Sequence, residues 1–122
     1  LQTRDGERRP VQLYQLTANL VSPDLKNMPV AVLLGSHTAS SGELVAVAFS
    51  GRPQTRSFGV PTAGLANSNS SFKLPDGSMI FLKTAIAVDR NGRVFGEKVA
   101  PDVNDEQNAR TTASNWLKEQ CK

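Results

Sequence analysis

The fold is decided by residues 29–49, which have the sequence PVAVLLGSHTASSGELVAVAF. The first six residues form a continuous apolar run that ends at Gly35, and a β-branched run of this length predicts a strand covered on both faces. Residues 44–49 are uniformly apolar, and Gly51 and Pro53 follow them, which predicts a helix that ends there. Because a helix that is apolar on all sides must lie between other layers, we expect an α/β core.

A short loop of small residues joins this strand to this helix, and it contains Ser40 and Ser41. The first N–H groups of a helix have no partner within the helix, and the positive end of the helix dipole lies there. A serine at such a position can be an exposed nucleophile, with neighbouring N–H groups stabilising an oxyanion. Alternatively, one serine is only the N-cap, and Glu43 completes a capping box with it. The spacing alone favours the capping interpretation, because Ser-x-x-Glu is common before an apolar helix.

The remaining sequence predicts further strands, two hairpins and a last helix. Turn-forming residues at 75–78 and 89–92 separate apolar segments, which is typical of hairpins. Asn104 or Asp105 can cap the last helix. The other predicted elements are an edge strand at 11–20, a strand at 55–62, a polar loop at 67–71, hairpin strands at 72–74, 79–82, 85–88 and 94–95, and a helix face formed by Ala109, Thr112, Ala113, Trp116 and Leu117.

The 122 residues fit one domain or a part of one. We divide them into an N-terminal arm with the edge strand (1–28), a core (29–103) and a C-terminal helix (104–122). The net charge of +3 comes from scattered basic residues, so we expect no nucleic-acid partner. Cys121 and His37 are the only cysteine and histidine, so we expect no internal disulfide, no metal and no cofactor.

The sequence also bears on membranes and on the extent of the chain. The longest apolar run is too short to span a bilayer. The chain begins without Met and without a leader sequence, so we interpret it as part of a longer protein. We expect any membrane association to come from regions outside this sequence.

Residues 29–43 resemble the nucleophile segment of the tail-specific (C-terminal processing) serine peptidase superfamily. The Thr-Ala-Ser-Ser motif at residues 38–41, followed by Gly-Glu, is most similar to the branch of tricorn-core and nisin-resistance proteins. Four later blocks occur in the family's order and spacing, so the resemblance covers most of the chain from Pro29 to Val103. These blocks are residues 51–53 (GRP), 59–66 (GVPTAGLA), 74–77 (LPDG) and 99–103 (VAPDV).

The resemblance implies both a fold and a reaction. The implied fold is part of a ClpP/crotonase-like α/β catalytic core, with a mixed sheet, a buried nucleophile helix and the C-terminal helix. By the same likeness, Ser40 is the nucleophile that forms an acyl-enzyme during peptide-bond hydrolysis, and the Ser41 N–H contributes to the oxyanion hole. Family members act on peptide or protein substrates, often at C-terminal ends, outside the bacterial cytoplasm (periplasmic, secreted or membrane-anchored).

The sequence departs from the lysine-dependent members of the family at the general base. These members carry the base in the segment Gly-x-x-Thr-x-Gly-Lys-Gly, whereas Leu65 occupies the position of the lysine here. Lys73 and Lys83 are predicted strand residues, so we do not expect either to replace it. A leucine at this position resembles the Ser–His branch, whose histidine comes from a more N-terminal region. We therefore expect the isolated chain to be inactive.

Further candidate residues surround Ser40 in the sequence. His37 lies three residues before Ser40, where the family does not place its histidine, so we expect it to help bind substrate rather than act as the base. Thr62, Gly64 and Asn67 fall where the family builds part of the cleft wall. They are candidates for substrate-binding or supporting residues, and Asn67 can also be a turn residue.

A second interpretation is a catalytically degenerate module that binds a ligand or peptide on the same fold. The interphotoreceptor retinoid-binding proteins resemble this family and bind apolar ligands, and Leu65 in place of the lysine would suit such a site. The retained Thr-Ala-Ser-Ser motif favours the enzyme, because a binding module has no reason to keep an exposed serine at a helix start. In a third interpretation the domain is structural and Ser40 is only a cap.

Overall fold

The computed structural model describes residues 27–121, so the edge strand predicted at residues 11–20 lies outside the described part. The described residues form an α/β structure, as predicted, and none of their helices is long and apolar enough to cross a membrane. The elements in chain order are β1 (Val30–Leu34), α1 (Ser41–Phe49), β2 (Thr55–Gly59), β3 (Asn67–Lys73), β4 (Met79–Val88), β5 (Val94–Phe95), β6 (Val103–Asn104) and α2 (Ala109–Gln120).

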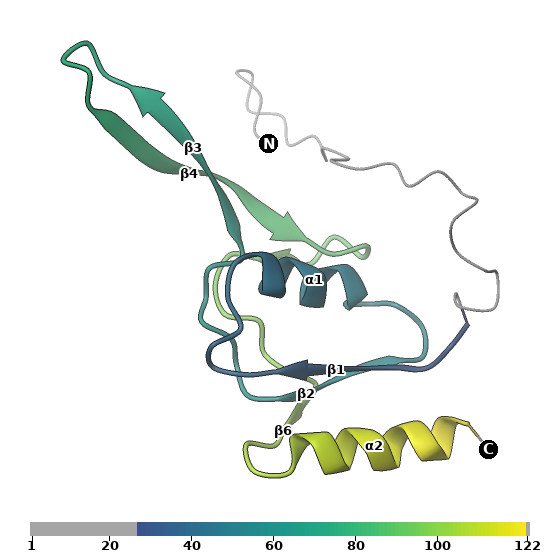
Figure 1. Ribbon diagram of the computed structural model, residues 1–122. Coiled ribbons are helices and arrows are strands. Elements are labelled where there is room, and N and C mark those ends of the chain that lie inside the picture. The colour runs from purple at the N-terminus through teal and green to yellow at the C-terminus, as the bar shows by residue number, and fades with distance from the viewer. Residues whose placement is uncertain (1–26, 122) are drawn as a thin grey trace.

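A parallel sheet forms the centre of the molecule, with its strands in the order β1-β2-β6. β1 and β2 pair over their full length, from Val30 opposite Thr55 to Leu34 opposite Gly59, and β6 pairs with the last two residues of β2. Helix α1 lies over one face of this sheet and α2 over the other (Figure 1). Because β1 and β2 are parallel and in register, the loops that follow them lie at the same edge of the sheet.

The C-terminal helix packs through its predicted face but starts later than predicted. The Trp116 ring lies 5.8 Å from the ring of Phe58 on β2. Asn108 occupies the N-cap position instead of Asn104 or Asp105, and its side chain makes no capping hydrogen bond. Asp105 caps the preceding turn, because its carboxylate accepts a hydrogen bond from the Asn108 N–H at 2.7 Å.

A separate antiparallel sheet contains β3, β4 and β5. β3 and β4 form a long hairpin that projects from the body of the molecule, and the end of β4 pairs with β5 (Figure 1). The Leu74 N–H donates to the Ser78 carbonyl at 2.8 Å and closes the first turn. Both predicted hairpins are confirmed, whereas the predicted mixed sheet is wrong, because the parallel and antiparallel strands form two sheets.

Two predicted boundaries are also wrong. Residues 67–71, predicted as a polar loop, are the first part of β3. Their low strand propensity is overridden by pairing with β4, where the Ser70 and Thr84 hydroxyl groups also form a hydrogen bond of 2.9 Å. The strand predicted at 55–62 ends at Gly59, where φ is 126°, a value that interrupts a strand.

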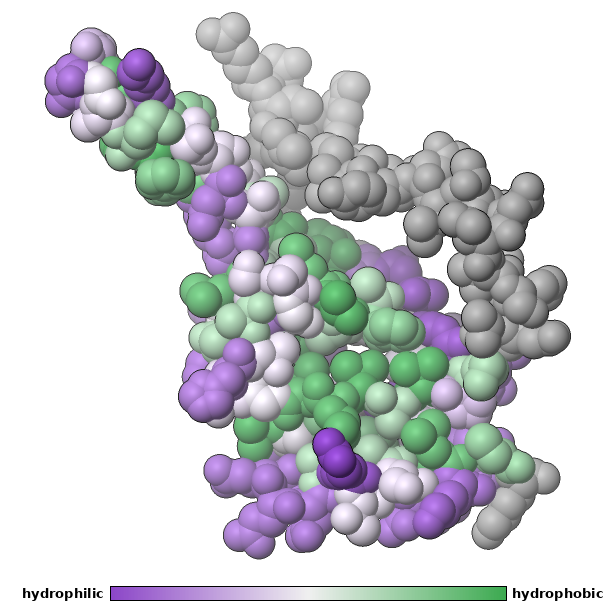
Figure 2. Space-filling model, in the orientation of Figure 1, coloured by the Kyte–Doolittle hydropathy of each residue, from purple (hydrophilic) through white to green (hydrophobic). Residues whose placement is uncertain are grey.

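The predicted burial of the first strand and the first helix is only partly correct. Helix α1 packs on the parallel sheet with one side, so that Leu44 and Val45 are 43% and 57% exposed. On β1, Leu33 is 48% exposed. Figure 2 shows hydrophobic residues gathered between α1 and α2, over β1. The described residues therefore do not cover these elements on all sides.

Replacing Gly59 by alanine tests how closely the ends of β1 and β2 are packed. A Cβ atom at this position would lie 2.0 Å from the Leu34 carbonyl oxygen, in addition to the positive φ. We expect Gly59→Ala to lower the free energy of unfolding by about 3 kcal/mol or more, measured by urea denaturation. Gly77→Ala is the matched control, because Gly77 also has a positive φ but has open space around it. Equal losses in the two variants would mean that contact with Leu34 has no effect.

Candidate active site

Ser40 occupies a sharp turn between β1 and α1. It is exposed, and its φ of 52° and ψ of −118° lie outside the regions that L-residues favour. Among the non-glycine residues that the structure describes, only Gln54 shares a positive φ. A conformation of this kind costs on the order of 1–3 kcal/mol and persists only where the surrounding structure fixes it. The strained backbone therefore coincides with the serine that the sequence singled out.

The turn before Ser40 is closed by two hydrogen bonds and joined to the loop after β2. The Gly35 N–H donates to the Thr38 hydroxyl at 3.0 Å, and the Thr38 N–H donates to the Gly35 carbonyl at 2.9 Å. The Thr38 carbonyl accepts a hydrogen bond from the Ala63 N–H at 2.9 Å. His37 lies in this turn and is exposed. The two loops at this edge of the sheet are thus in direct contact.

The first turn of α1 presents one backbone donor to the outside. The Gly42 and Glu43 N–H groups donate to carbonyls of the preceding turn, at 3.0 and 2.9 Å. The Ser41 N–H makes no hydrogen bond within residues 27–121. The Ser40 side chain takes the capping-box position beside the Glu43 N–H, which donates to the Ser40 carbonyl at 2.9 Å. An exposed hydroxyl therefore lies beside an unpaired N–H at the positive end of the helix dipole.

The Glu43 side chain is fully buried and connects this turn to the loop after β2. Its Oε2 accepts hydrogen bonds from the Ser40 N–H at 2.9 Å and from the Leu65 N–H at 2.7 Å. Its Oε1 accepts from the Gly64 N–H at 2.8 Å and from the Thr62 hydroxyl. The bond to Ser40 is the carboxylate half of the predicted capping box, whose other half is the Ser40 side chain beside the Glu43 N–H. The other three bonds were not predicted from the sequence.

These hydrogen bonds determine the charge of Glu43. Burial alone would raise the pKa of the carboxyl group, but the hydrogen bond from Thr62 and those from the Gly64, Leu65 and Ser40 N–H groups outweigh burial. The pKa of Glu43 is therefore lower than its ordinary value, and the group is ionised at neutral pH. A carboxylate that accepts four hydrogen bonds is suited to positioning the turn rather than to transferring a proton.

Thr62 extends the same network to a third segment. Its side chain is fully buried, and its hydroxyl donates to Glu43 while it accepts from the Val99 N–H at 2.8 Å. The Thr62 N–H donates to the Val99 carbonyl at 3.1 Å. A buried side chain cannot touch a substrate, so Thr62 fits the supporting role among the two roles considered for it.

The other candidates lie on the loop after β2. Gly64 has a φ of 98°, and a Cβ there would lie 3.2 Å from Cγ of Lys98. Asn67 is the first residue of β3, and its N–H donates to the Leu65 carbonyl at 2.8 Å. Leu65 itself is 54% exposed. The Glu43 carboxylate therefore bonds to both Gly64 and Ser40, whereas Asn67 is connected to this network only by its backbone bond to Leu65.

The described residues present no general base bonded to Ser40. No hydrogen bond within residues 27–121 links the Ser40 hydroxyl to a histidine, a lysine or a carboxylate. Lys83 donates instead to the Gly96 carbonyl at 3.0 Å, and Lys73 is exposed at the far end of β3. The same residues contain no group of three or more side chains that could hold a metal ion.

Most of the sequence matches a known family. Residues 1–105 match the family described as peptidase family S41. The chain belongs to peptidase family S41. The Thr-Ala-Ser-Ser motif and the strained turn at Ser40 therefore lie in a chain of peptidase ancestry, as the resemblance at residues 29–43 implied.

Individual proteins are also similar to this chain. The chain is 35% identical over 99 residues to a nisin-resistance protein of Lactococcus lactis subsp. lactis. The matched residues make up 80% of this chain and 31% of that protein. It is 34% identical to the solved structure of a lipoprotein from Streptococcus agalactiae, with a TM-score of 0.65 over 75% of this chain and 32% of that one. A solved structure from Parabacteroides merdae, 21% identical with a TM-score of 0.54 over 76% of this chain and 30% of that one, supports the fold alone.

The S41 chain described here spans about a third of the length of these relatives. The described residues account for the nucleophile turn and its supporting network. The remaining two thirds of a relative's length have no counterpart in this sequence.

Replacing Glu43 by Gln tests the network that supports Ser40. The amide has the same size but turns an NH2 group toward N–H donors, and we expect the free energy of unfolding to fall by about 2–4 kcal/mol at pH 7. Because the folded-state pKa of Glu43 lies below the unfolded value, its stabilisation is present above the ordinary glutamate pKa of about 4.3 and is lost as the pH falls through the folded-state pKa.

The difference in stability between the wild-type chain and Glu43→Gln should therefore be largest near neutral pH and shrink in acid. Urea denaturation at a series of pH values measures it. Glu119→Gln, which changes an exposed carboxylate on α2, is the matched control and should have no such effect. A difference that stays constant down to acid pH would contradict the ionised state of Glu43.

Proposed function

We propose that this chain carries the nucleophile and oxyanion hole of a serine peptidase that hydrolyses peptide bonds through an acyl-enzyme on Ser40. The observation that carries the proposal is the strained, exposed conformation of Ser40 at the start of a helix. A functional constraint is the common reason for a non-glycine residue to be held in such a conformation. Membership of peptidase family S41 supports the same reaction class.

The Ser41 N–H is the proposed oxyanion donor. It is unpaired within the described residues and lies directly after the nucleophile. In acyl transfer, a preorganised N–H group stabilises the charge that develops on the carbonyl oxygen. His37, Gly64 and Asn67 remain candidates for contacts with a peptide or protein substrate.

The general base is proposed to be a histidine in a polypeptide region N-terminal to this sequence. Leu65 cannot accept a proton, and the residues described here provide no base bonded to Ser40. A serine hydroxyl is a poor nucleophile without a base, so the 122-residue chain is expected to be inactive by itself. The fraction of the relatives' length that the chain spans is consistent with a further contributing region.

The finer features of the fold and location are part of the same proposal. The arrangement is proposed to be part of a ClpP/crotonase-like catalytic core of a C-terminal processing protease. A bacterial location outside the cytoplasm (periplasmic, secreted or membrane-anchored) is supported by the descriptions of two similar proteins as a lipoprotein and a nisin-resistance protein. Any membrane association is expected to come from regions outside this sequence.

The alternative is a catalytically degenerate module on the same fold that binds a ligand or peptide. Leu65 favours this alternative. It stands where the lysine-dependent members of the family have their general base, and a leucine side chain cannot accept a proton. The alternative predicts a folded protein whose Ser40 does not react with a serine-directed probe.

A fluorophosphonate probe distinguishes these functions in the longer polypeptide that we propose contains this chain. We expect the probe to label Ser40, and Ser40→Ala to reduce labelling at least about 100-fold because the nucleophilic oxygen is removed. Ser41→Ala is the matched control and should keep most of the labelling, because its backbone N–H remains.

Probe labelling of the two variants and of the wild-type protein distinguishes the peptidase from the binding module. Labelling that persists in Ser40→Ala and disappears in Ser41→Ala would identify the other serine as the nucleophile. A folded, complete protein that is not labelled at all would favour the binding module.

A further inference from the structure

The loop after β2 is hydrogen-bonded, through three consecutive N–H groups, to the turn between β1 and α1 and to the first turn of the helix. The Ala63 N–H donates to the Thr38 carbonyl at 2.9 Å. The Gly64 and Leu65 N–H groups donate to the Glu43 carboxylate at 2.8 and 2.7 Å. These bonds hold the loop directly against the candidate nucleophile's turn.

Leu65 carries the only large side chain of these three loop residues, because the other two are alanine and glycine. This side chain is 54% exposed, whereas the next residue, Ala66, is fully buried in the core. The Leu65 N–H and the Ser40 N–H share one acceptor atom, Oε2 of Glu43. The residue with this exposed apolar side chain is therefore a direct neighbour of Ser40.

The backbone of Leu65 is fixed on both sides of the residue. Its N–H is bonded to Glu43, and its carbonyl accepts a hydrogen bond from the Asn67 N–H at 2.8 Å. Neither bond involves the side chain, so the side chain is free to contact a ligand while the backbone holds its place. A contact surface on an ordered backbone loses less conformational entropy when a ligand binds.

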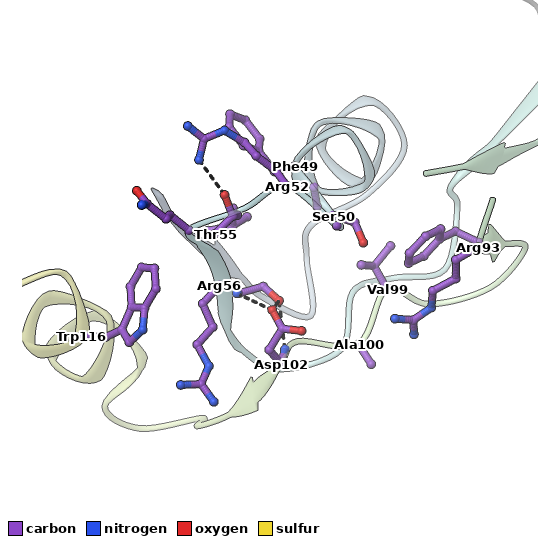
Figure 3. Close-up of a pocket in the computed structure, with 16 residues that line it drawn as sticks. Phe49, Ser50, Arg52, Thr55, Arg56, Arg93, Val99, Ala100, Asp102 and Trp116 are labelled. Atoms are coloured by element: carbon purple, nitrogen blue, oxygen red, sulfur yellow. Dashed lines mark hydrogen bonds between the residues drawn. The ribbon is translucent and has the colours of Figure 1, made fainter. Parts of the chain in front are cut away.

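A cavity of about 440 Å³ lies at the end of α1 remote from Ser40, where Phe49, Val99 and Asp102 are among the residues that line it (Figure 3). No residue of the candidate active site lines this cavity. Because α1 has nine residues, about 13 Å of helix separates its two ends. A substrate side chain beside the scissile bond is too short to reach the cavity, so it contacts the loops around Ser40 instead.

We infer that Leu65 determines substrate specificity: its side chain contacts the side chain of the residue whose carbonyl Ser40 attacks, and it favours an aliphatic residue there. This preference rests on the proposed peptidase function and names the kind of substrate residue that the site selects. Contact between two apolar side chains removes both from water, which is favourable. A methylene group gained or lost in such a contact changes the specificity of an enzyme by about tenfold or more.

Two phosphonate probes measure this preference in the longer polypeptide that we propose contains this chain. They are the diphenyl phosphonate analogues of acetyl-Ala-Leu and acetyl-Ala-Ala, which differ only in the side chain beside the reactive phosphorus. In the reaction, the Ser40 oxygen forms a bond to phosphorus, and one phenoxide group leaves as phenol with the proton of the hydroxyl. Phenol release therefore gives the rate constant, and we expect the leucine probe to react at least about tenfold faster than the alanine probe.

Variants assign the preference to the Leu65 side chain. Leu65→Ala should slow the leucine probe about tenfold and change the rate of the alanine probe by less than about twofold, because alanine keeps the N–H that binds Glu43. Leu65→Met, which conserves the volume of the side chain, should retain the preference. Leu82→Ala is the matched control and should change neither rate, because Leu82 is 51% exposed on β4, in the hairpin that projects from the body of the molecule (Figure 1).

The ratio of the two probe rates distinguishes specificity from a structural role. Equal slowing of both probes in Leu65→Ala would mean that Leu65 acts only through the position of Ser40, and it would overturn the inference. An unchanged ratio in this variant would overturn it as well. If the fluorophosphonate labels Ser40 and the ratio is unchanged, only the specificity of Leu65 is refuted. If the folded wild-type protein is not labelled at all, the proposed peptidase function fails, and the inference fails with it.

Discussion

The candidate active site around Ser40 depends on a single buried carboxylate, that of Glu43. Glu43 accepts four hydrogen bonds, from the backbone of Ser40, Gly64 and Leu65 and from the Thr62 hydroxyl. Burial of an ionised group is costly unless such bonds compensate it, and bonds to a charged acceptor are about twice as strong as neutral ones. The start of α1 and the loop after β2 are therefore held together by one charge. Through Thr62, the same charge also reaches the segment at Val99.

This arrangement explains how Ser40 keeps a strained backbone. The strain costs on the order of 1–3 kcal/mol, and a hydrogen bond to a charged group contributes about 1.5–3 kcal/mol, so the Ser40 N–H bond to Glu43 is comparable with the whole cost. Ser40 stays at the surface, with its side chain in the capping-box position beside the Glu43 N–H. Glu43 thus holds the first serine of the motif in an exposed turn at the start of the helix.

Local signals in the sequence predicted β1, the end of α1 and both hairpins, because glycine, proline and turn residues act within a few positions. Pairing partners were not predictable in the same way, so the polar start of β3 was expected to be a loop. The supporting role of Glu43 was predictable only in part. Ser40 is three residues away and forms a recognisable capping pair, whereas Thr62 and Gly64 are 19 and 21 residues away and reach Glu43 only through the parallel register of β1 and β2.

Hydrogen exchange of individual backbone amides, measured by NMR, tests the central role of Glu43 most directly. The account predicts that the Ser40, Gly64 and Leu65 N–H groups are protected to a similar degree in the wild-type chain, because they share one acceptor group, and that all three lose protection together when Glu43 is replaced by Gln. Rapid exchange of the Ser40 amide in the wild-type chain, while the amides of α1 remain protected, would contradict it.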